Sequence, residues 1–330
     1  MIPASLARRA ALLALSLILA TAAAWGQGET PKPNTDVPAP TPPPAVLPEV
    51  PPVPALPPPV VRIPDRGDFK LVYEKTKNPD YLGLQQIFKE TQLLQETVRA
   101  LNDTLAMPAD VTAALRECGT ADAPYDADKR RISICYELID SLSDLFTADV
   151  TSEEGIQQAG IAVAGATLFI FFHEAGHALI RLDSLPVTGK EEDAVDQLAT
   201  LLLLESGRQG EKAALDGATT FLAREKDAKS QAALARMPFW NAHALNQQRF
   251  ANVICWVYGK NPAEFQYLVE DGTLPSDRAA QCTAEFEQMA KTWDALLGPY
   301  LKGPGLAPPP PVPAPPAPPV PSPSPTPPTP

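Results

Sequence analysis

Two hydrophobic patterns alternate in the chain ahead of residue 137. Residues 81–105 carry apolar side chains at the three- and four-residue spacing of an amphipathic helix. Residues 68–74, 110–117 and 130–136 are short runs with the composition of strands. The last two runs surround the turn-rich residues 119–128, so we expect them to form a hairpin within a small antiparallel sheet.

From residue 137 onward the pattern is helical almost throughout. Two capping boxes, Thr151 with Glu154 and Thr188 with Glu191, are predicted to open two of these helices. The fold class is therefore α+β, mostly helical, with the small antiparallel sheet packed beside a long central helix. The predicted helices cover residues 137–147, 151–181, 188–205, 208–227, 244–258 and 276–297.

The N-terminus has the composition of an export signal. Arg8 and Arg9 precede an uncharged apolar segment over residues 10–24, and small residues follow where a signal peptidase would cut. We therefore interpret residues 1–26 as a signal peptide and expect a secreted or periplasmic protein. No cysteine stands directly after the apolar segment, which argues against a lipid anchor.

Proline divides the mature chain into three parts. Of the 40 prolines, 15 lie in residues 31–64 and 16 in residues 304–330. Such segments cannot bury enough apolar surface to offset the entropy of ordering, so we expect disordered Pro-rich linkers over residues 27–65 and 303–330. The remaining residues, 66–302, have a suitable length for one folded domain. The linkers could contact a partner in the cell envelope.

Nucleic acid and the membrane interior are disfavoured as partners. The formal net charge is -12, whereas a phosphate-binding surface needs a basic excess. The apolar stretch ahead of His173 is about fourteen residues long, the size of a buried core helix, and a membrane span needs about 20. We expect no stable membrane span once the signal peptide is removed.

The four cysteines are expected to form disulfides. Their number is even, none stands in a Cys-x-x-Cys pair, and the chain carries an export signal. Four cysteines allow three connectivities. Because Cys118 and Cys135 flank the predicted hairpin, and Cys255 and Cys282 lie in two C-terminal helical segments, we predict those two local pairs.

The segment His173-Glu174-Ala175-Gly176-His177, in the long predicted helix, carries candidate chemistry. Residues four apart lie on one face of a helix, so His173 and His177 can direct two imidazoles at one metal ion. Glu174 is rotated by about 100° around the helix axis and can reach a metal-bound water without being a ligand. Zinc lowers the pKa of bound water to about 7, so a carboxylate suffices as base. The pattern predicts a Zn²⁺ site with Glu174 as catalytic base.

A catalytic zinc site requires a third protein ligand, and a carboxylate at the start of the next helix could supply it. Glu192 fits this position, and Asp196, one turn later, could accept the outer N–H of a ligating histidine and fix its tautomer. Acidic residues also favour helix starts for electrostatic reasons. Glu192 and Asp196 could therefore be ordinary acidic residues of a solvated helix start, as could the neighbouring Glu191 and Asp193.

The third histidine of the chain, His243, precedes a helical segment that contains Arg249. A histidine there could stabilise the oxyanion of a peptide-hydrolysis transition state, and we take it as a second catalytic residue, although it could equally cap a helix. Arg249 either contributes to the same site or pairs with a carboxylate. Tyr125 and Tyr136, near the predicted hairpin, are expected to be packing residues.

These residues resemble the gluzincins, the thermolysin-like peptidases, which combine His-Glu-x-x-His with a downstream Glu-x-x-x-Asp, here Glu192 to Asp196. More closely, residues 69–297 resemble an uncharacterised bacterial family of exported metallopeptidases whose activity is itself inferred. The resemblance implies hydrolysis of peptide bonds in a peptide or protein substrate, held in extended form by an edge strand. The fourteen residues between His177 and Glu192 are fewer than in the best-known gluzincins, which leaves the ligand assignment open to Glu191 or Asp193.

One alternative is a zinc-binding envelope protein without turnover, which acts as a Pro-tailed interaction module. Structural zinc sites are usually closed by four Cys or His ligands. Three apparent ligands and a neighbouring base favour an enzyme instead.

Overall fold

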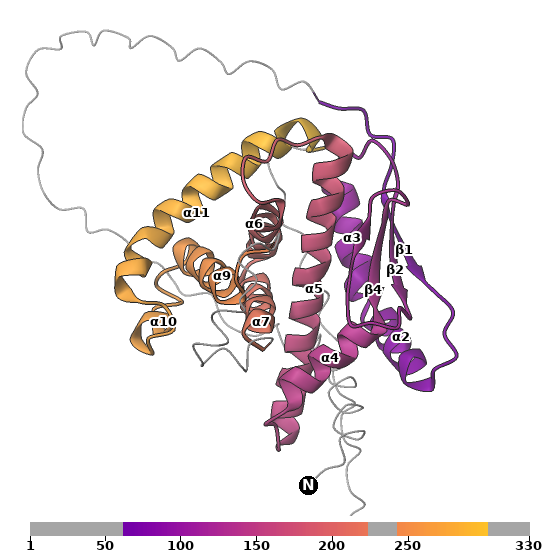
Figure 1. Ribbon diagram of the computed structural model, residues 1–330, viewed down its shortest axis with the longest axis horizontal. Helices are drawn as coiled ribbons and strands as arrows, with labels where there is room; N and C mark the ends of the chain where they lie inside the picture. Colours follow the sequence, from indigo (N-terminus) through magenta and orange to yellow (C-terminus); the bar gives the residue numbers. More distant parts are fainter. Residues whose placement is uncertain (1–61, 224–242, 303–330) are drawn as a thin grey trace, which may run out of the picture.

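The computed structural model of the protein describes residues 62–223 and 243–302. The predicted signal peptide and nearly all of both Pro-rich linkers lie outside these ranges, as does the end of the helix predicted over residues 208–227. Within them, a small sheet lies on one side of a long central helix and most of the other helices lie on its other side (Figure 1). The α+β class predicted from the sequence is confirmed.

The sheet has four strands in the order β1-β2-β4-β3. They are β1 (Phe69–Tyr73), β2 (Val111–Arg116), β3 (Tyr125–Asp126) and β4 (Arg131–Cys135). β1 pairs with β2 and β2 with β4 in parallel, and only β3 is antiparallel to its neighbour β4. The expectation of an antiparallel sheet is therefore wrong for two of its three strand pairs.

A helical crossover explains the parallel pairing of β1 with β2, because parallel neighbours need a connection that returns the chain to the same end of the sheet. This connection contains two helices, α2 (Pro79–Thr91) and α3 (Leu93–Thr104), where the sequence predicted one. Gln92 separates them in the left-handed backbone conformation, at φ 55°. The buried faces of both helices pack into the same core as the strands.

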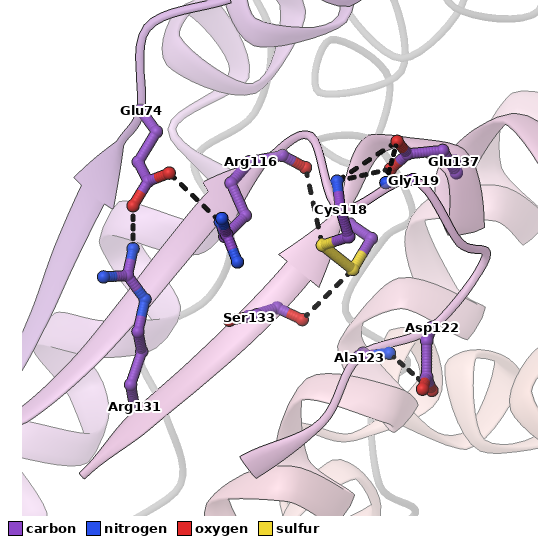
Figure 2. The surroundings of a disulfide bond; sticks show 10 residues. Glu74, Arg116, Cys118, Gly119, Asp122, Ala123, Arg131, Ser133 and Glu137 are labelled. Carbon is purple, nitrogen blue, oxygen red and sulfur yellow. Dashed lines mark hydrogen bonds and ion pairs between the residues drawn. A yellow bond between two sulfur atoms is a disulfide. The ribbon is translucent and has the colours of Figure 1, made fainter. Parts of the chain in front are cut away.

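The predicted hairpin is replaced by an excursion of the chain between β2 and β4 that contains β3. Arg116 is opposite Cys135 in the parallel register, so the neighbouring Cys118 can form a disulfide with Cys135 (Figure 2). In a hairpin these two cysteines would lie at opposite ends of the strand pair. The Glu137 carboxylate accepts hydrogen bonds from the backbone N–H groups of Cys118 and Gly119 at 3.1 and 2.7 Å, which fixes the start of the excursion.

The helical part contains one long helix and six shorter segments in the described ranges. The long helix is α5 (Glu153–Asp183), and one 18-residue window in it is long and apolar enough to cross a membrane, yet 61% of that window is buried inside the fold. This burial is what a core helix shows. The other segments are α4 (Tyr136–Thr147), α6 (Glu191–Leu204), α7 (Arg208–Ala223), α9 (Asn246–Lys260), α10 (Tyr267–Glu270) and α11 (Ser276–Leu297), and the 3-10 turn η2 (Gly298–Tyr300) follows.

Both predicted capping boxes are wrong. Ser152 caps α5 by accepting from the Gly155 N–H at 3.1 Å, one residue later than the predicted cap Thr151. α6 begins at Glu191 itself, with no side-chain cap on its N-cap residue. The Glu191 carboxylate cannot serve a cap at Thr188 because it contacts a histidine of α5.

The second disulfide, Cys255–Cys282, joins α9 to α11. A close approach of these helices is needed beside it: a Cβ atom at Gly259 would lie 2.2 Å from the backbone oxygen of Cys282. The structure thus contains both cysteine pairs that the sequence predicts, one at the sheet and one between the C-terminal helices.

Candidate metal and catalytic site

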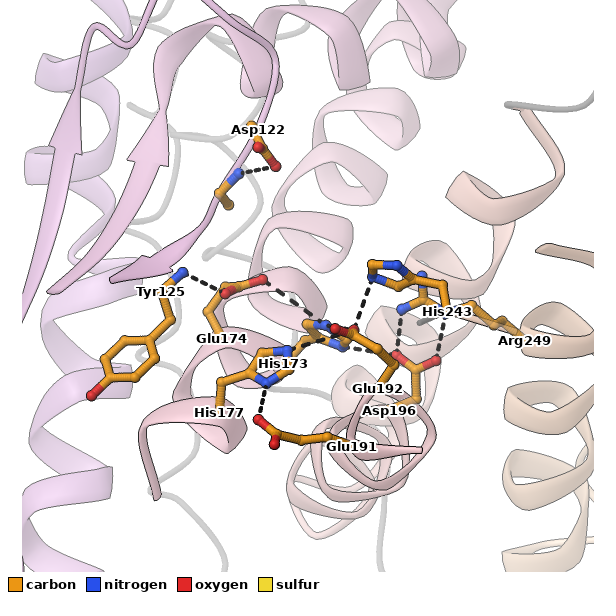
Figure 3. A network of polar contacts seen from close by, with 11 residues as sticks. Asp122, Tyr125, His173, Glu174, His177, Glu191, Glu192, Asp196, His243 and Arg249 are labelled. Atoms are coloured by element: carbon orange, nitrogen blue, oxygen red, sulfur yellow. Dashed lines mark hydrogen bonds and ion pairs between the residues drawn. The ribbon is translucent and has the colours of Figure 1, made fainter. Parts of the chain in front are cut away.

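Close packing of α5 on α6 brings the candidate site residues together. A Cβ atom at Gly176 would lie 2.9 Å from a methyl carbon of Val195, so the glycine allows the two helices to approach. The face of α5 that carries His173 and His177 is thereby directed at the acidic first turns of α6 (Figure 3). Both His173 and Asp196 are buried at this contact, at 6% and 2% exposed.

Three imidazoles meet at the carboxylate of Glu192. The Nε2 atoms of His173, His177 and His243 lie 3.2, 3.5 and 2.9 Å from Glu192 Oε2. That oxygen is buried, yet among the described residues none is aligned to form a hydrogen bond with it. A buried carboxylate oxygen without a hydrogen bond, surrounded by imidazole nitrogens, is suited to a cation, and His and Glu donors suit zinc.

Two overlapping triads could hold such an ion. The ligand atoms of His173, Glu174 and His177 lie within 4.8 Å of one another, as do those of His173, Glu192 and His243. His173 belongs to both, so the triads describe one centre. Burial alone raises the pKa of Glu192, but the three imidazoles outweigh it and hold that pKa well below its usual range. Glu192 is therefore a carboxylate, the form that binds metal.

A buried chain of polar contacts orients His173. Its Nδ1 atom lies 2.8 Å from Asp196 Oδ1, and the Arg249 guanidinium donates to both Asp196 oxygens at 2.6 and 2.7 Å. Burial raises the pKa of Asp196, but hydrogen bonds from Arg249 and His173 reverse the shift and lower it. Asp196 is thus an acceptor, so Nδ1 of His173 carries the proton and Nε2 is left for a metal. Arg249 pairs with a carboxylate, one of its two expected roles.

His177 has a corresponding partner that the sequence interpretation did not assign. Its Nδ1 atom lies 2.9 Å from Glu191 Oε1, and the other Glu191 oxygen accepts from Arg181 at 3.0 Å. Arg181 follows His177 by one turn of α5, a spacing that could have pointed to a shared acidic partner. Of the three consecutive acidic residues, only Glu192 forms ion pairs with the Nε2 atoms in the described ranges, and Asp193 forms none with a histidine there.

Glu174 is held beside this centre by the edge strand of the sheet. Its Oε2 accepts from the backbone N–H of Tyr125 in β3 at 2.8 Å, and its Oε1 lies 4.0 Å from His173 Nε2. Burial raises the pKa of Glu174 and the two histidines of its motif only partly offset the rise. A carboxylate with a raised pKa is a stronger proton acceptor. Sequence reasoning missed the Tyr125 backbone contact, because it considered only the ring.

The structure brings His243 to the candidate centre and places Tyr136 in the core. His243 lies in the segment before α9, its side chain is 44% exposed, and its backbone oxygen accepts from Lys190 at 3.2 Å. Tyr136 lies in the core instead, where it stacks on Tyr81 at 5.2 Å and its hydroxyl accepts from Gln85.

Comparison with known proteins gives one match. The family described as "Putative metallopeptidase" matches residues 73–297, about two thirds of the chain, which include every histidine and acidic residue of the site. No curated protein and no solved structure matches. The chain therefore belongs to this metallopeptidase family.

Proposed function

We propose that this protein is an exported, zinc-dependent peptidase of the gluzincin type that hydrolyses peptide bonds in peptides or proteins. The observation that carries the proposal is the meeting of imidazole Nε2 atoms at the Glu192 carboxylate, with Glu174 beside it. His173, His177 and Glu192 would hold the zinc, a His₂Glu donor set used by catalytic sites. When bound, zinc supplies Lewis-acid polarisation of the scissile carbonyl and an acidified water.

Glu174 would act as general base and then as general acid. Its carboxylate accepts a proton from the attacking water and passes that proton to the leaving amine. The Tyr125 N–H fixes Oε2, so Oε1 is the oxygen that faces the histidines. A raised pKa supports this role because the protonated state that donates to the amine becomes accessible nearer neutral pH.

His243 would stabilise the transition state of the hydrolysis. Its ring is partly exposed and reaches the same Glu192 oxygen as the two motif histidines. A hydrogen-bond donor placed at the edge of a metal centre can interact with the oxyanion that develops from the substrate carbonyl. His243 completes the second triad with His173 and Glu192, so the same position could instead add a ligand.

The edge strand β3 would hold the substrate in extended form, as the gluzincin resemblance implies. The carbonyl groups of Asp122 and Pro124 accept from backbone N–H groups of β4, at 3.3 and 3.0 Å. Backbone groups of alternate residues point to opposite sides of a strand, so those of Tyr125 face away from β4, toward Glu174. A peptide paired with this edge would pass directly over the proposed base.

Export is supported by two independent features. The N-terminal 26 residues have the pattern of a signal peptide, and the two disulfides fit an oxidising compartment. We therefore place the folded domain, residues 66–302, in the periplasm or outside the cell, between Pro-rich linkers that could engage an envelope partner. The burial of α5 supports its role as a core helix of that domain.

The test is metal analysis of the purified mature protein combined with a screen of proteome-derived peptides, for the wild type and Glu174→Gln. We expect about one zinc per chain in both proteins, because Glu174 is not a ligand, and cleavage by the wild type alone. Zinc without any cleavage would support the zinc-binding module instead. Loss of zinc from Glu174→Gln would contradict the assignment of Glu174 as the base.

A further inference from the structure

Two chains of polar contacts, each an arginine, a carboxylate and a histidine, support the centre from opposite sides. In the first, Arg249 binds Asp196 and Asp196 binds His173. In the second, Arg181 binds Glu191 and Glu191 binds Nδ1 of His177, at 2.9 Å. The first corresponds to the Glu-x-x-x-Asp pattern in the sequence, and the second has no counterpart in that pattern.

We propose that Glu191 is a positioning residue for His177, equivalent to Asp196 for His173, and that its support of metal binding weakens with salt while that of Asp196 does not. The inference rests on the proposed function, since it assumes that His177 is a metal ligand. It assigns to Glu191 a role distinct from that of an acidic helix start.

The orientation of the Glu191 carboxylate supports the first part of the proposal, that Glu191 positions His177. A residue that served only the start of α6 would direct its oxygens at backbone N–H groups of that helix. Instead, Oε1 and Oε2 are both engaged by side chains of α5 that lie one turn apart, His177 and Arg181. An acceptor on Nδ1 fixes the ring and its tautomer, and it makes Nε2 the better donor to a metal.

A difference in solvent exposure supports the second part of the proposal, the dependence on salt. The Asp196 and Arg249 side chains are 3% and 10% exposed, whereas those of Glu191 and Arg181 are 25% and 62% exposed. An ion pair at the surface stabilises less as the salt concentration rises, whereas a buried pair is screened much less. Glu191 should therefore hold His177 less firmly as ionic strength rises, while Asp196 should hold His173 as before.

The experiment measures zinc affinity of the mature full-length protein by competition with a chelator, in low and high concentrations of a non-coordinating salt. Removing an outer partner of a metal-bound histidine typically costs about 10 to 100-fold, so at low salt we expect Glu191→Ala to weaken binding roughly 10-fold. Glu191→Gln should recover only part of this loss, because its amide oxygen still accepts from Nδ1 but the negative charge is gone, and the affinity of this variant should depend less on salt than that of the wild type. At high salt the difference between Glu191→Ala and wild type should shrink.

Asp193→Ala is the matched control, since it removes the same charge from the same helical turn, and Asp193 forms no ion pair with a histidine in the part of the chain that the structure describes. Its zinc affinity should stay within about twofold of wild type, and only Glu191→Ala should alter the d–d absorption spectrum of the cobalt-substituted protein. Equal effects of Glu191→Ala and Asp193→Ala would overturn the inference. If the wild type binds zinc but cleaves nothing, the zinc affinities of the variants still test the role of Glu191. A wild type without zinc affinity would refute the proposed function itself.

Discussion

Replacing Arg249 with methionine should destabilise the protein strongly, because it removes the guanidinium that donates to both oxygens of a buried carboxylate. Arg249 makes two charge-assisted hydrogen bonds to Asp196, and its guanidinium carbon lies 4.0 Å from the centre of the Phe221 ring. Removing one partner of a buried ion pair costs about 3–5 kcal/mol. Methionine keeps much of the apolar volume of the side chain, so we expect a loss of about 4 kcal/mol. For a domain of this size that corresponds to roughly 8 to 16 °C in Tm.

Urea unfolding of the zinc-free protein measures this loss without a contribution from metal binding. Arg181→Met is the matched control, since it removes an arginine from an exposed ion pair and should cost less than about 1 kcal/mol. The double variant Asp196→Asn with Arg249→Met should be more stable than Arg249→Met alone, because no unpaired charge remains in the interior. Equal stability of the two single arginine variants would refute the buried pair.

The remaining predictions concern the ligand set, a buried acid and the sheet disulfide. Glu192→Ala should lose bound zinc, while Asp193→Ala should keep it; metal analysis with the opposite outcome would show that the ligand is misassigned. Burial raises the pKa of Asp183 from 3.8 to about 6. The contribution of this carboxyl group to the free energy of unfolding is therefore fully present below pH 3.8 and is lost as the pH rises through about 6. Asp183→Asn should accordingly gain about 1 kcal/mol in urea unfolding near pH 7, a gain discounted for solvent screening, and nothing near pH 3. Replacing Cys118 and Cys135 together with alanine should cost about 3 kcal/mol in the same assay, and an unchanged midpoint would show that this bridge does not stabilise the fold.

The residues proposed for the centre of the site can be identified from the sequence because their spacing follows helical periodicity. His173 and His177 are one turn apart, and the spacing alone places them on one face. Glu192 and Asp196 repeat that spacing in the next helix. Glu191 is harder to interpret, since an acidic residue at a helix start has an ordinary explanation, and only the packing of α6 on α5 shows that it contacts His177.

The direction of the strands could not be read from local composition. A turn-rich segment between two strand-like runs indicates a hairpin, whereas here it contains a third strand and returns the chain to a parallel partner. The cysteines held a usable signal: Cys118 follows one strand and Cys135 ends the other, so a disulfide between them requires parallel strands. The break at Gln92 carries no such signal, because glutamine has no preference for the left-handed conformation.

The most direct test of a catalytic centre is the coordination of bound zinc, measured by X-ray absorption at the zinc edge of the wild-type protein. An open site should show two imidazole nitrogens at about 2.0–2.1 Å together with carboxylate and water oxygens, and it should be unchanged in His243→Ala. A closed site with three imidazoles, in which His243→Ala removes one of them and no water is bound, would contradict a zinc peptidase and indicate a structural metal.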